Sequence, residues 1–375
     1  MRGRHDKLVF VHPCGGRGSP DLRTSHSAIS MLQILVAIFG LSLLVIVHEA
    51  GHYLFARAFG IRVTRFSIGL GPVLAKYQPK GSPTVFQVCA IPFLAYVMIA
   101  GMNPAEEIDP DDPGLYPNKG IIARTLTIFG GPLANYLAAS LMVFGLALTG
   151  WRDDVPSEPM VIDSVEPGSP AANAGLRPGD IILEADGRAI RNVKQLIDVT
   201  GPRAEKSTRY VIQRDGKSLP ALDITPRRTE GRGVIGVTPK FEPHYRALPV
   251  GEAAVLAVSL PWQYTVANLS GMADLIRRRT TEGLTGPVGM GKLVAQQAEK
   301  GMYAFVHILI AISVALGSFN LLPFPALDGG RLVFLGYEII TRRRPNERIE
   351  AAVHTVGLLF LLGVIALVTL RDMVS

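Results

Sequence analysis

Residues 31–60 read MLQILVAIFGLSLLVIVHEAGHYLFARAFG, and this stretch decides the fold of the chain. Its first half is apolar apart from Gln33 and Ser42, which is typical of a helix that spans a membrane. The run passes directly into the pentapeptide HEAGH at 48–52. A charged side chain near the centre of a bilayer costs about 2.5–3.5 kcal/mol, so ionisable residues in a membrane helix indicate a functional site.

Three further apolar runs follow, at about 121–148, 302–327 and 352–370. Each has roughly the 20 residues that an α-helix needs to cross about 30 Å of hydrocarbon. The chain of 375 residues is 48% hydrophobic and only 18% charged, against about 25% charged in soluble proteins. These values exclude an ordinary soluble enzyme and a disordered chain. We therefore expect an α-helical membrane protein with four transmembrane helices, the first at 31–56, rather than a soluble core of buried helices.

Lys and Arg residues predict how these spans are oriented, because basic loops stay in the cytoplasm. They gather between the first two spans and between the last two, namely Arg57, Arg62, Arg65, Lys76, Lys80, Lys119, Arg331, Arg342, Arg343, Arg344 and Arg348. We expect both loops inside the cell, with the N-terminus, 151–300 and the C-terminus outside. These loops explain the net charge of +7 without a nucleic-acid partner. The polar leader at 1–30 is also basic and conflicts with this orientation, so we interpret Met31 as the true start.

The pentapeptide predicts a metal site. On a helix, His48 and His52 lie one turn apart on the same face, so both imidazoles reach a single ion. Glu49 lies beside them, in position to take a proton from an attacking water molecule. The alternative is a set of polar residues at the end of the helix. The two cysteines, Cys14 and Cys89, form neither a disulfide framework nor a zinc finger.

A catalytic zinc usually has three protein ligands, which leaves one position for water. The best third candidate is Asp328, in NLLPFPALDGGR at 320–331. Asp328 lies at the end of the third span, and His52 lies near the end of the first. If exactly one span returns between them, both helices run in the same direction and these two ends lie at the same depth in the membrane. Pro323 and Pro325 break the helix before Asp328, so irregular backbone there faces a polar cavity. The alternative for Asp328 is a turn-forming Asp-Gly at the interface.

Residues 249–268 are the candidate for a fifth span. An acidic residue and a proline within this segment favour an interfacial helix instead, and we expect a linker after it up to residue 300. A fifth span would reverse the direction of the span at 302–327 across the membrane. Asp328 would then lie on the opposite face, roughly 25–30 Å from the two histidines. Two other histidines lie in apolar runs. We expect His307 near the outer surface, and we interpret His354 as an interfacial residue or a polar support of the metal site.

Six short motifs resemble the site-2 protease family of intramembrane zinc metalloproteases, in particular its regulator-of-sigma-E protease type. The resemblance covers nearly everything from Met31 to the C-terminus. The motifs are HEAGH at 48–52, FSIGLGP at 66–72, GGPLAN at 130–135, GLRPGD at 175–180, GLTGPVG at 283–289 and NLLPFPALDGG at 320–330.

This resemblance implies a Zn²⁺ cofactor, three zinc ligands and a general base, namely His48, His52, Asp328 and Glu49. It also implies a substrate-positioning role for Asn320, whose alternative is a helix residue hydrogen-bonded to a neighbour. Asn135 is a second candidate for substrate positioning, or for helix packing and polar support of the site. Gly130 and Gly131 in the same motif more simply permit a close approach of helices.

The chain reads as two halves of a membrane protease core, 31–150 and 301–375, with a module inserted between them. In the first half, the resemblance implies a re-entrant β-hairpin at 61–98 that pairs with an unwound substrate; the alternative is an ordinary cytoplasmic β-loop. The inserted segment 155–240 contains GLRPGDIILEADG at 175–187, which resembles a PDZ domain. The resemblance implies an extracytoplasmic α+β domain that gates the active site and binds a peptide; the alternative is a spacer without affinity.

The resemblance further implies a multi-pass protein of the bacterial inner membrane, with its active site towards the cytoplasm. Its implied reaction is hydrolysis of a peptide bond in or near the transmembrane helix of single-span substrates, such as anti-sigma factors or signal-peptide remnants. Two other classes stay open at this point. One is an inactive membrane PDZ adaptor with a structural metal site. The other is a metal transporter, which would need a second cluster of ligands along its path.

Overall fold

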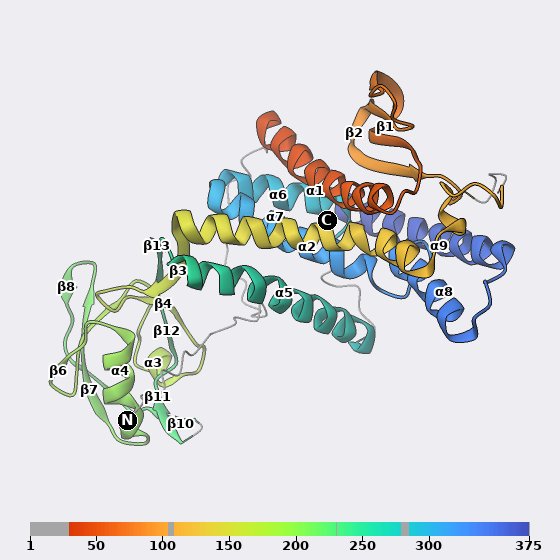
Figure 1. Cartoon of the computed structure of the whole chain (residues 1–375). Coiled ribbons are helices and arrows are strands. Elements are labelled where there is room, and N and C mark those ends of the chain that lie inside the picture. Colours follow the sequence, from red (N-terminus) through yellow and green to blue (C-terminus); the bar gives the residue numbers. More distant parts are fainter. Residues whose placement is uncertain (1–29, 104–108, 230, 279–284, 375) are drawn as a thin grey trace.

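The computed structural model describes residues 30–103, 109–229, 231–278 and 285–374. The predicted leader at 1–30 lies outside the described residues apart from its last residue. A bundle of long helices forms the body of the molecule (Figure 1). A β-rich module lies at one end of this bundle, and a β-hairpin lies near the other.

Four of the described helices are long and apolar enough to cross a membrane. They are α1 (Met31–Ala58), α2 (Ile121–Gly150), α7 (Met302–Asn320) and α9 (Glu347–Val374). The sequence predicted four such segments in these places, and this part of the predicted fold is confirmed. Helix α1 begins with a capping box, in which the Ser30 hydroxyl accepts from the backbone of residue 33 and the residue 33 side chain accepts from Ser30 N–H.

The predicted end of the third apolar helix was wrong. Helix α7 ends at Asn320, and the expected range 302–327 therefore includes a non-helical loop. Pro323 and Pro325 explain the difference, because proline in a helix interior removes a hydrogen bond and clashes with the preceding turn. The loop leads into a further helix that the sequence did not predict, α8 (Asp328–Thr341).

Close glycine contacts fix the packing of α1 and α7 against α2. A Cβ atom on Gly51 would lie 2.1 Å from the carbonyl oxygen of Gly130, so the two backbones touch where α1 crosses α2. A Cβ atom on Gly317 of α7 would lie 3.1 Å from the ring of Tyr136 on α2. Small residues at such crossings let membrane helices approach closely. Helices α1 and α7 run in the same direction, towards the end of the bundle that carries α8 (Figure 1).

The segment after the β-rich module forms two helices, where we expected one short helix and a linker. Helix α5 (Val250–Arg278) packs lengthwise along α2 and α7, and its Ala257 belongs to their shared apolar cluster. Helix α6 (Pro287–Glu299) packs against α1 and α7. Helix α5 is not among the four helices that are apolar enough to span a membrane, and its interfacial location stays a prediction.

The predicted β-hairpin consists of two bent strands, β1 (Val63–Tyr77) and β2 (Val85–Ile99). Ile68 lies opposite both Ala95 and Val88, so the first half of β1 lies between the two halves of β2. The second half of β2 therefore forms one edge of the sheet. A short 3₁₀ helix, η1 (Tyr116–Asn118), leads from this region into α2. The re-entrant position of the hairpin in a membrane stays a prediction.

The inserted module fits the predicted PDZ domain. A two-stranded stem, β3 (Trp151–Pro156) with β13 (Phe241–Arg246), joins it to α2 and α5. Helix α4 (Val193–Thr200) and the strand β7 (Thr208–Arg214) enclose a core that includes the buried ring of Tyr210. The other elements are β4 (Ile162–Val165), α3 (Pro170–Asn173), β5 (Ile181–Ala185), β6 (Arg188–Ala189), η2 (Gly201–Arg203), β8 (Lys217–Ser218), β9 (Leu222–Ile224), β10 (Arg227–Thr229), β11 (Arg232–Val234) and β12 (Val237–Pro239).

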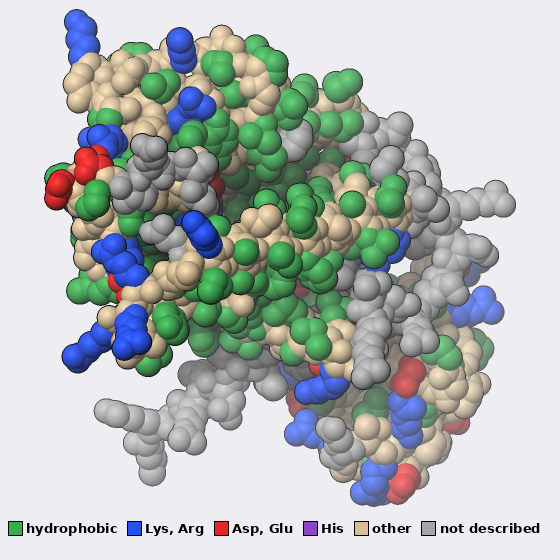
Figure 2. Space-filling model, turned by 90° about the vertical axis from the view of Figure 1, so that its right-hand side faces the viewer, with side chains coloured by type: hydrophobic (Ala, Val, Ile, Leu, Met, Phe, Trp, Pro, Cys, Tyr) green, Lys and Arg blue, Asp and Glu red, His purple; other side chains and the backbone are tan. Residues whose placement is uncertain are grey.

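Large apolar side chains remain exposed along the outside of the bundle, as a lipid-facing surface requires. Phe39 of α1 is 68% exposed, Leu141 of α2 is 71% exposed and Leu359 of α9 is 65% exposed. Figure 2 shows hydrophobic side chains covering much of one face, with Lys and Arg side chains near its margin. A soluble protein rarely leaves such a continuous apolar surface in contact with water.

Candidate metal centre

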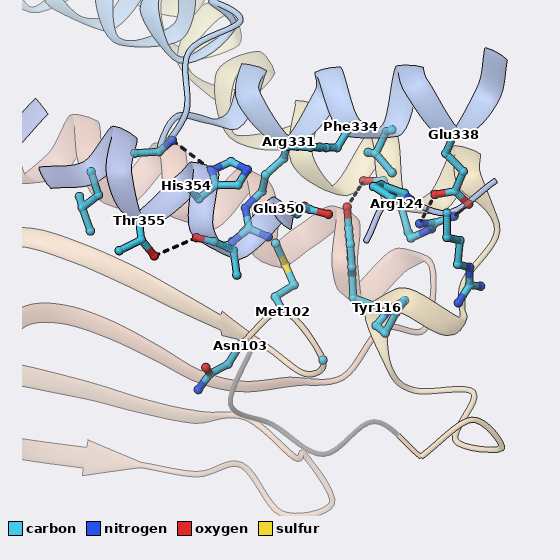
Figure 3. Close-up of a pocket in the computed structure, with 18 residues that line it drawn as sticks. Met102, Asn103, Tyr116, Arg124, Arg331, Phe334, Glu338, Glu350, His354 and Thr355 are labelled. Carbon is cyan, nitrogen blue, oxygen red and sulfur yellow. Dashed lines mark hydrogen bonds and ion pairs between the residues drawn. The ribbon is translucent and has the colours of Figure 1, made fainter. Parts of the chain in front are cut away.

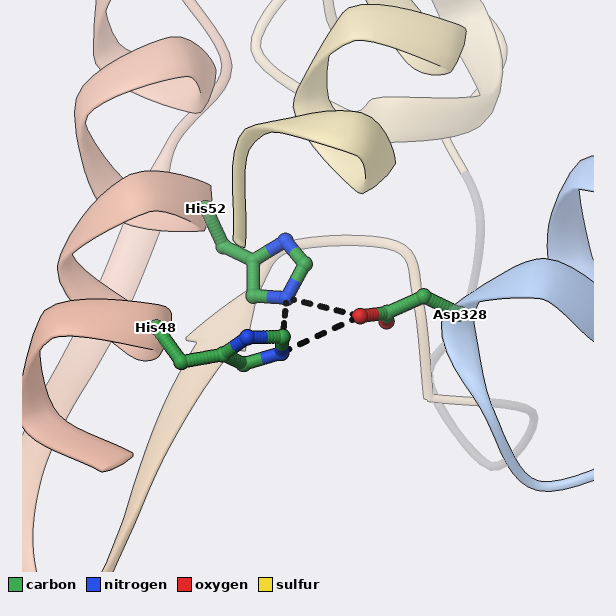
Figure 4. A group of neighbouring side chains, drawn as sticks. All are labelled: His48, His52 and Asp328. Atoms are coloured by element: carbon green, nitrogen blue, oxygen red, sulfur yellow. Dashed lines mark hydrogen bonds and ion pairs between the residues drawn. The ribbon is translucent and has the colours of Figure 1, made fainter. Parts of the chain in front are cut away.

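Three side chains from two helices meet in the interior of the bundle (Figure 4). The Nε2 atoms of His48 and His52 lie 3.1 and 3.3 Å from Oδ2 of Asp328, and 3.2 Å from each other. The two histidine side chains are 8% exposed and the aspartate is 18% exposed. The structure thus brings together the three residues that the sequence nominated as ligands.

The spacing and chemistry of these atoms fit one metal ion. Tetrahedral ligands at the usual zinc distances lie about 3.3 Å from one another, close to the separations observed here. Two imidazole nitrogens and one carboxylate oxygen form a donor set that zinc accepts in catalytic sites. With these three ligands, a tetrahedral ion keeps one position for water or substrate.

Helix α2 supports the other nitrogen of each imidazole. Nδ1 of His52 lies 2.9 Å from the carbonyl oxygen of Thr127, which can accept a hydrogen bond from Nδ1–H and leave Nε2 free for a metal. Nδ1 of His48 lies 3.2 Å from Nδ2 of Asn135, while Oδ1 of this buried amide has no partner among the described residues. A half-turn of the amide brings Oδ1 to Nδ1–H, which is the arrangement that a metal at Nε2 requires.

The two glycines before Pro132 make room for the histidine pair. A Cβ atom on Gly131 would lie 2.3 Å from Nε2 of His52, in the space where a metal ligand must be placed. A Cβ atom on Gly130 would lie 2.8 Å from the carbonyl oxygen of Gly51. The motif GGPLAN therefore combines a close helix crossing with space for the ring and, at Asn135, a polar partner for the second ring.

The loop after α7 holds Asp328 at the first position of α8. Ala326 has a φ of 76°, and its N–H donates a 3.0 Å hydrogen bond to Nδ1 of His354 at the start of α9. Gly329 has no room for a side chain, because a Cβ there would lie 2.1 Å from the carbonyl oxygen of Leu322. His354 therefore supports the loop that carries the aspartate, in addition to lying at the start of an apolar helix.

Glu49 lies between the metal group and the edge of the hairpin. Its carboxylate interacts electrostatically with His48, His52 and Asp328, and it accepts a hydrogen bond from the backbone N–H of Val97 in β2. This hydrogen bond places the second half of β2 directly beside Glu49 and the metal group. A carboxylate in this position can exchange a proton with a water molecule or a peptide near the metal.

Other candidate residues have contacts outside the metal group. Nδ2 of Asn320 donates to the carbonyl oxygen of Leu316 one turn earlier, which is the bond expected from its alternative interpretation as a helix residue. His307 lies at the opposite end of α7, stacked on Tyr303 and 3.1 Å from the hydroxyl of Tyr264. Its aromatic neighbours are typical of a membrane–water interface.

Sequence reasoning missed two contacts of the centre. Thr127 contributes a backbone carbonyl, and a sequence motif does not predict a backbone contact of this kind. Ser313 of α7 is buried and donates a 2.9 Å hydrogen bond to the backbone carbonyl of Asn135. This bond joins α7 to the residue that faces His48, so α7 also contributes to the geometry of the group, beside α1, α2, α8 and α9.

Comparison with known proteins gives a consistent family assignment. The model of peptidase family M50 matches residues 36–364. A relative in Nostoc sp. named as a zinc metalloprotease is 32% identical, and the alignment covers 88% of this chain and 93% of the relative. A second, in Synechocystis sp., is 34% identical with coverages of 92% and 95%. The metalloprotease MmpA of Caulobacter vibrioides is 31% identical with coverages of 92% and 96%.

A solved PDZ domain from Listeria monocytogenes is 26% identical over 23% of the chain and covers 90% of that domain, with a TM-score of 0.20. The family match, in contrast, extends through both halves of the membrane core and through the metal group. The chain therefore belongs to peptidase family M50, the site-2 proteases.

Proposed function

We propose that this protein is a zinc metalloendopeptidase that hydrolyses a peptide bond in or near the transmembrane helix of a single-span membrane protein. The observation that carries the proposal is the meeting of His48, His52 and Asp328, with Glu49 beside them, inside a bundle of apolar helices. Such groups are costly inside a membrane unless they have a function. Membership of a peptidase family supports the same reaction.

His48, His52 and Asp328 would hold the zinc ion. When bound, zinc supplies Lewis acidity that makes a nearby water molecule more acidic and polarises the scissile carbonyl. Glu49 takes the proton from the attacking water and returns it to the amine that leaves. The N–H of Val97 holds the Glu49 carboxylate by a hydrogen bond, so this base is already oriented before the substrate binds.

The hairpin offers a way to present an extended peptide to this base. The second half of β2 pairs with β1 on one side only, and no other described strand adds to its free edge. Val97, which contacts Glu49, lies in this half. A substrate helix that unwinds can add a strand to such an edge, which exposes its carbonyl groups for attack. This support applies equally to an anti-sigma factor and to a signal-peptide remnant.

The basic loops support a cytoplasmic location of the metal end. The turn between α8 and α9 carries Arg342, Arg343 and Arg344, all exposed, at the end of the bundle opposite the PDZ domain (Figure 1). By the positive-inside rule this end faces the cytoplasm, and the PDZ domain lies on the other side of a bacterial inner membrane. There its peptide groove would act as a filter for substrates that approach the active site.

The decisive test uses the Glu49→Gln variant of the purified chain in lipid vesicles, with a tagged single-span helix as substrate. We expect zinc content to be retained and cleavage to fall at least 100-fold, because the general base is lost while the ligands remain. Glu252→Gln, an exposed position on α5, is the matched control and should cleave normally. If the unaltered chain holds zinc but cleaves no membrane helix, the inactive PDZ adaptor is the better description.

A further inference from the structure

A cavity of about 420 Å³ lies between the residues that follow β2, helix α8 and the start of α9 (Figure 3). The metal ligands and Glu49 are not among the residues that line it. Its walls are partly apolar, with Met102, Phe334 and Leu358, and partly basic, with Arg331 and Arg344. Its chemistry is therefore different from that of the metal centre.

Two hydrogen-bond donors on residues that line this cavity have no acceptor among the described residues. The half-buried guanidinium of Arg331 forms no ion pair or hydrogen bond with the residues that the structure describes, and it lies beside His354 (Figure 3). Nδ1 of His354 already accepts from Ala326 N–H, so in the neutral ring the proton is on Nε2. Nε2 is buried and has no partner among the described residues. The unpaired guanidinium of Arg331 therefore favours an anionic ligand in the cavity, and the buried Nε2–H of His354 lies in the wall behind it.

The acidic residues of the cavity do not supply the missing acceptor. Glu338 accepts two hydrogen bonds from Arg124, at 3.0 and 2.6 Å, and forms a closed ion pair with it. Glu350 has an interaction of its own. The lining contains three arginines, Arg124, Arg331 and Arg344, against these two glutamates. The lining as a whole therefore carries one more positive than negative charge.

The position of the cavity indicates where the anion comes from. Pro117 of its lining precedes α2, and Pro345 precedes α9, so the cavity lies where two apolar helices begin. In a bilayer, phosphate headgroups lie at the ends of such helices. The same face of α9 that lines the cavity with Leu358 continues with Leu362 and Ile365, by helical periodicity. These three side chains are 47%, 52% and 37% exposed, and they form an apolar path leading away from the basic cavity.

We propose that this cavity binds the phosphate of an anionic phospholipid, with Arg331 as the donor and an acyl chain along the exposed face of α9. A free phosphate ion shares the headgroup chemistry but would leave the apolar path unused. The proposal depends on the membrane location of α2 and α9. It does not depend on peptidase activity, and a binding measurement can therefore succeed or fail independently of the proposed function.

The test is a titration of the purified full-length chain in detergent with short-chain phosphatidylglycerol, short-chain phosphatidylcholine and inorganic phosphate as separate probes. We expect phosphatidylglycerol to bind at least tenfold more tightly than either of the other two. Arg331→Gln should weaken that binding at least tenfold, since it removes a charged donor. Arg343→Gln removes the same charge from an exposed position in the turn between α8 and α9, outside the cavity, and should change the affinity less than twofold.

Arg331→Lys separates a folding defect from loss of the ligand, because it keeps the charge but removes the fork of donors. It should bind phosphatidylglycerol with intermediate affinity and retain the helical circular dichroism of the unaltered chain. Equal losses from Arg331→Gln and Arg343→Gln would show diffuse attraction by a basic surface and overturn the proposal. Equal affinity for inorganic phosphate and for the lipid would overturn the lipid assignment, and equal affinity for phosphatidylcholine would overturn the anionic selectivity.

Discussion

Nδ1 of His52 lies 2.9 Å from the carbonyl oxygen of Thr127, and this contact joins the metal-binding face of α1 to the backbone of α2. A helix carbonyl cannot rotate away as a side chain can, so it holds the imidazole in one tautomer with Nε2 towards Asp328. The contact depends on the close crossing of the two helices at Gly51 and Gly130. The geometry of the centre is therefore a consequence of how α1 packs on α2.

Replacement of Gly131 by alanine should damage the metal site directly. The new Cβ would lie 2.3 Å from Nε2 of His52, so the ring has to leave the position in which Nε2 meets Asp328. We expect zinc affinity to fall roughly 10–100-fold, the range found when groups that orient metal ligands are altered. Competition with a chelator of known zinc affinity measures the change.

Gly145 is the matched control on the same helix. A Cβ there meets nothing within 4 Å, and alanine is favoured over glycine in a helix interior by up to about 1 kcal/mol. Gly145→Ala should therefore keep full zinc affinity and be at least as stable as the unaltered chain. Equal zinc affinity in the Gly131 and Gly145 variants would contradict the crowding argument.

A pair of substitutions at Asn135 tests whether its oxygen orients His48. Asn135→Asp keeps an oxygen facing Nδ1 of His48, whereas Asn135→Leu presents only carbon to it. Because carboxylates serve well as partners of metal-bound histidines, we expect the aspartate variant to retain zinc and the leucine variant to lose affinity by about tenfold or more. Zinc binding is read by the same chelator competition, and cleavage by the vesicle assay. Similar losses in both variants would favour a packing role for the asparagine instead.

The sequence was sufficient for the apolar helices and for the metal group, because both have strong local signals. HEAGH fixes two ligands and a base by helical spacing, and the break at Pro323 marks the loop before Asp328. Helix α8 was missed because its apolar stripe is short and follows a proline-rich loop. The double register of β1 with β2 was missed because pairing partners far apart in sequence leave no local pattern. The Thr127 contact was missed because every residue has a carbonyl.

The PDZ domain contains a buried ion pair whose contribution depends on pH. Asp180 is buried, accepts from the backbone N–H of Arg177, and forms a forked pair with Arg214 at 2.6 and 2.7 Å. Burial by itself raises the pKa of Asp180, but the hydrogen bonds and charge of Arg214 and the Arg177 N–H more than offset it, and the pKa is held below its usual value. The contribution of Asp180 to the free energy of unfolding is therefore fully present above its pKa in the unfolded chain, about 3.9. It is lost as the pH falls through its lower pKa in the folded protein.

Asp180→Asn should make the module less stable near neutral pH, because it removes the buried charge that pairs with the Arg214 guanidinium. Hydrogen exchange of the β5 and β7 amides in the full-length chain measures the change, and acidification should reduce the difference between the variant and the unaltered chain. Asp223→Asn, at an exposed position of β9, is the control and should alter exchange little. An unchanged protection pattern in Asp180→Asn at neutral pH would argue against this pair as a support of the fold.

His354 gives a last test, of whether α9 helps to position the third ligand. Its Nδ1 accepts from Ala326 N–H two residues before Asp328, and a leucine there would leave that part-buried N–H without its acceptor. The loss of such a bond costs about 1–3 kcal/mol, and the loop would relax to recover it, which displaces the carboxylate. We expect His354→Leu to weaken zinc binding about tenfold while His48 and His52 still retain some metal. Thr355→Val is the control, since among the described residues the Thr355 hydroxyl bonds to a carbonyl of its own helix, at Ala351. If both variants bind zinc as the unaltered chain does, the loop is held by its prolines and glycines alone, and α9 has no part in the metal geometry.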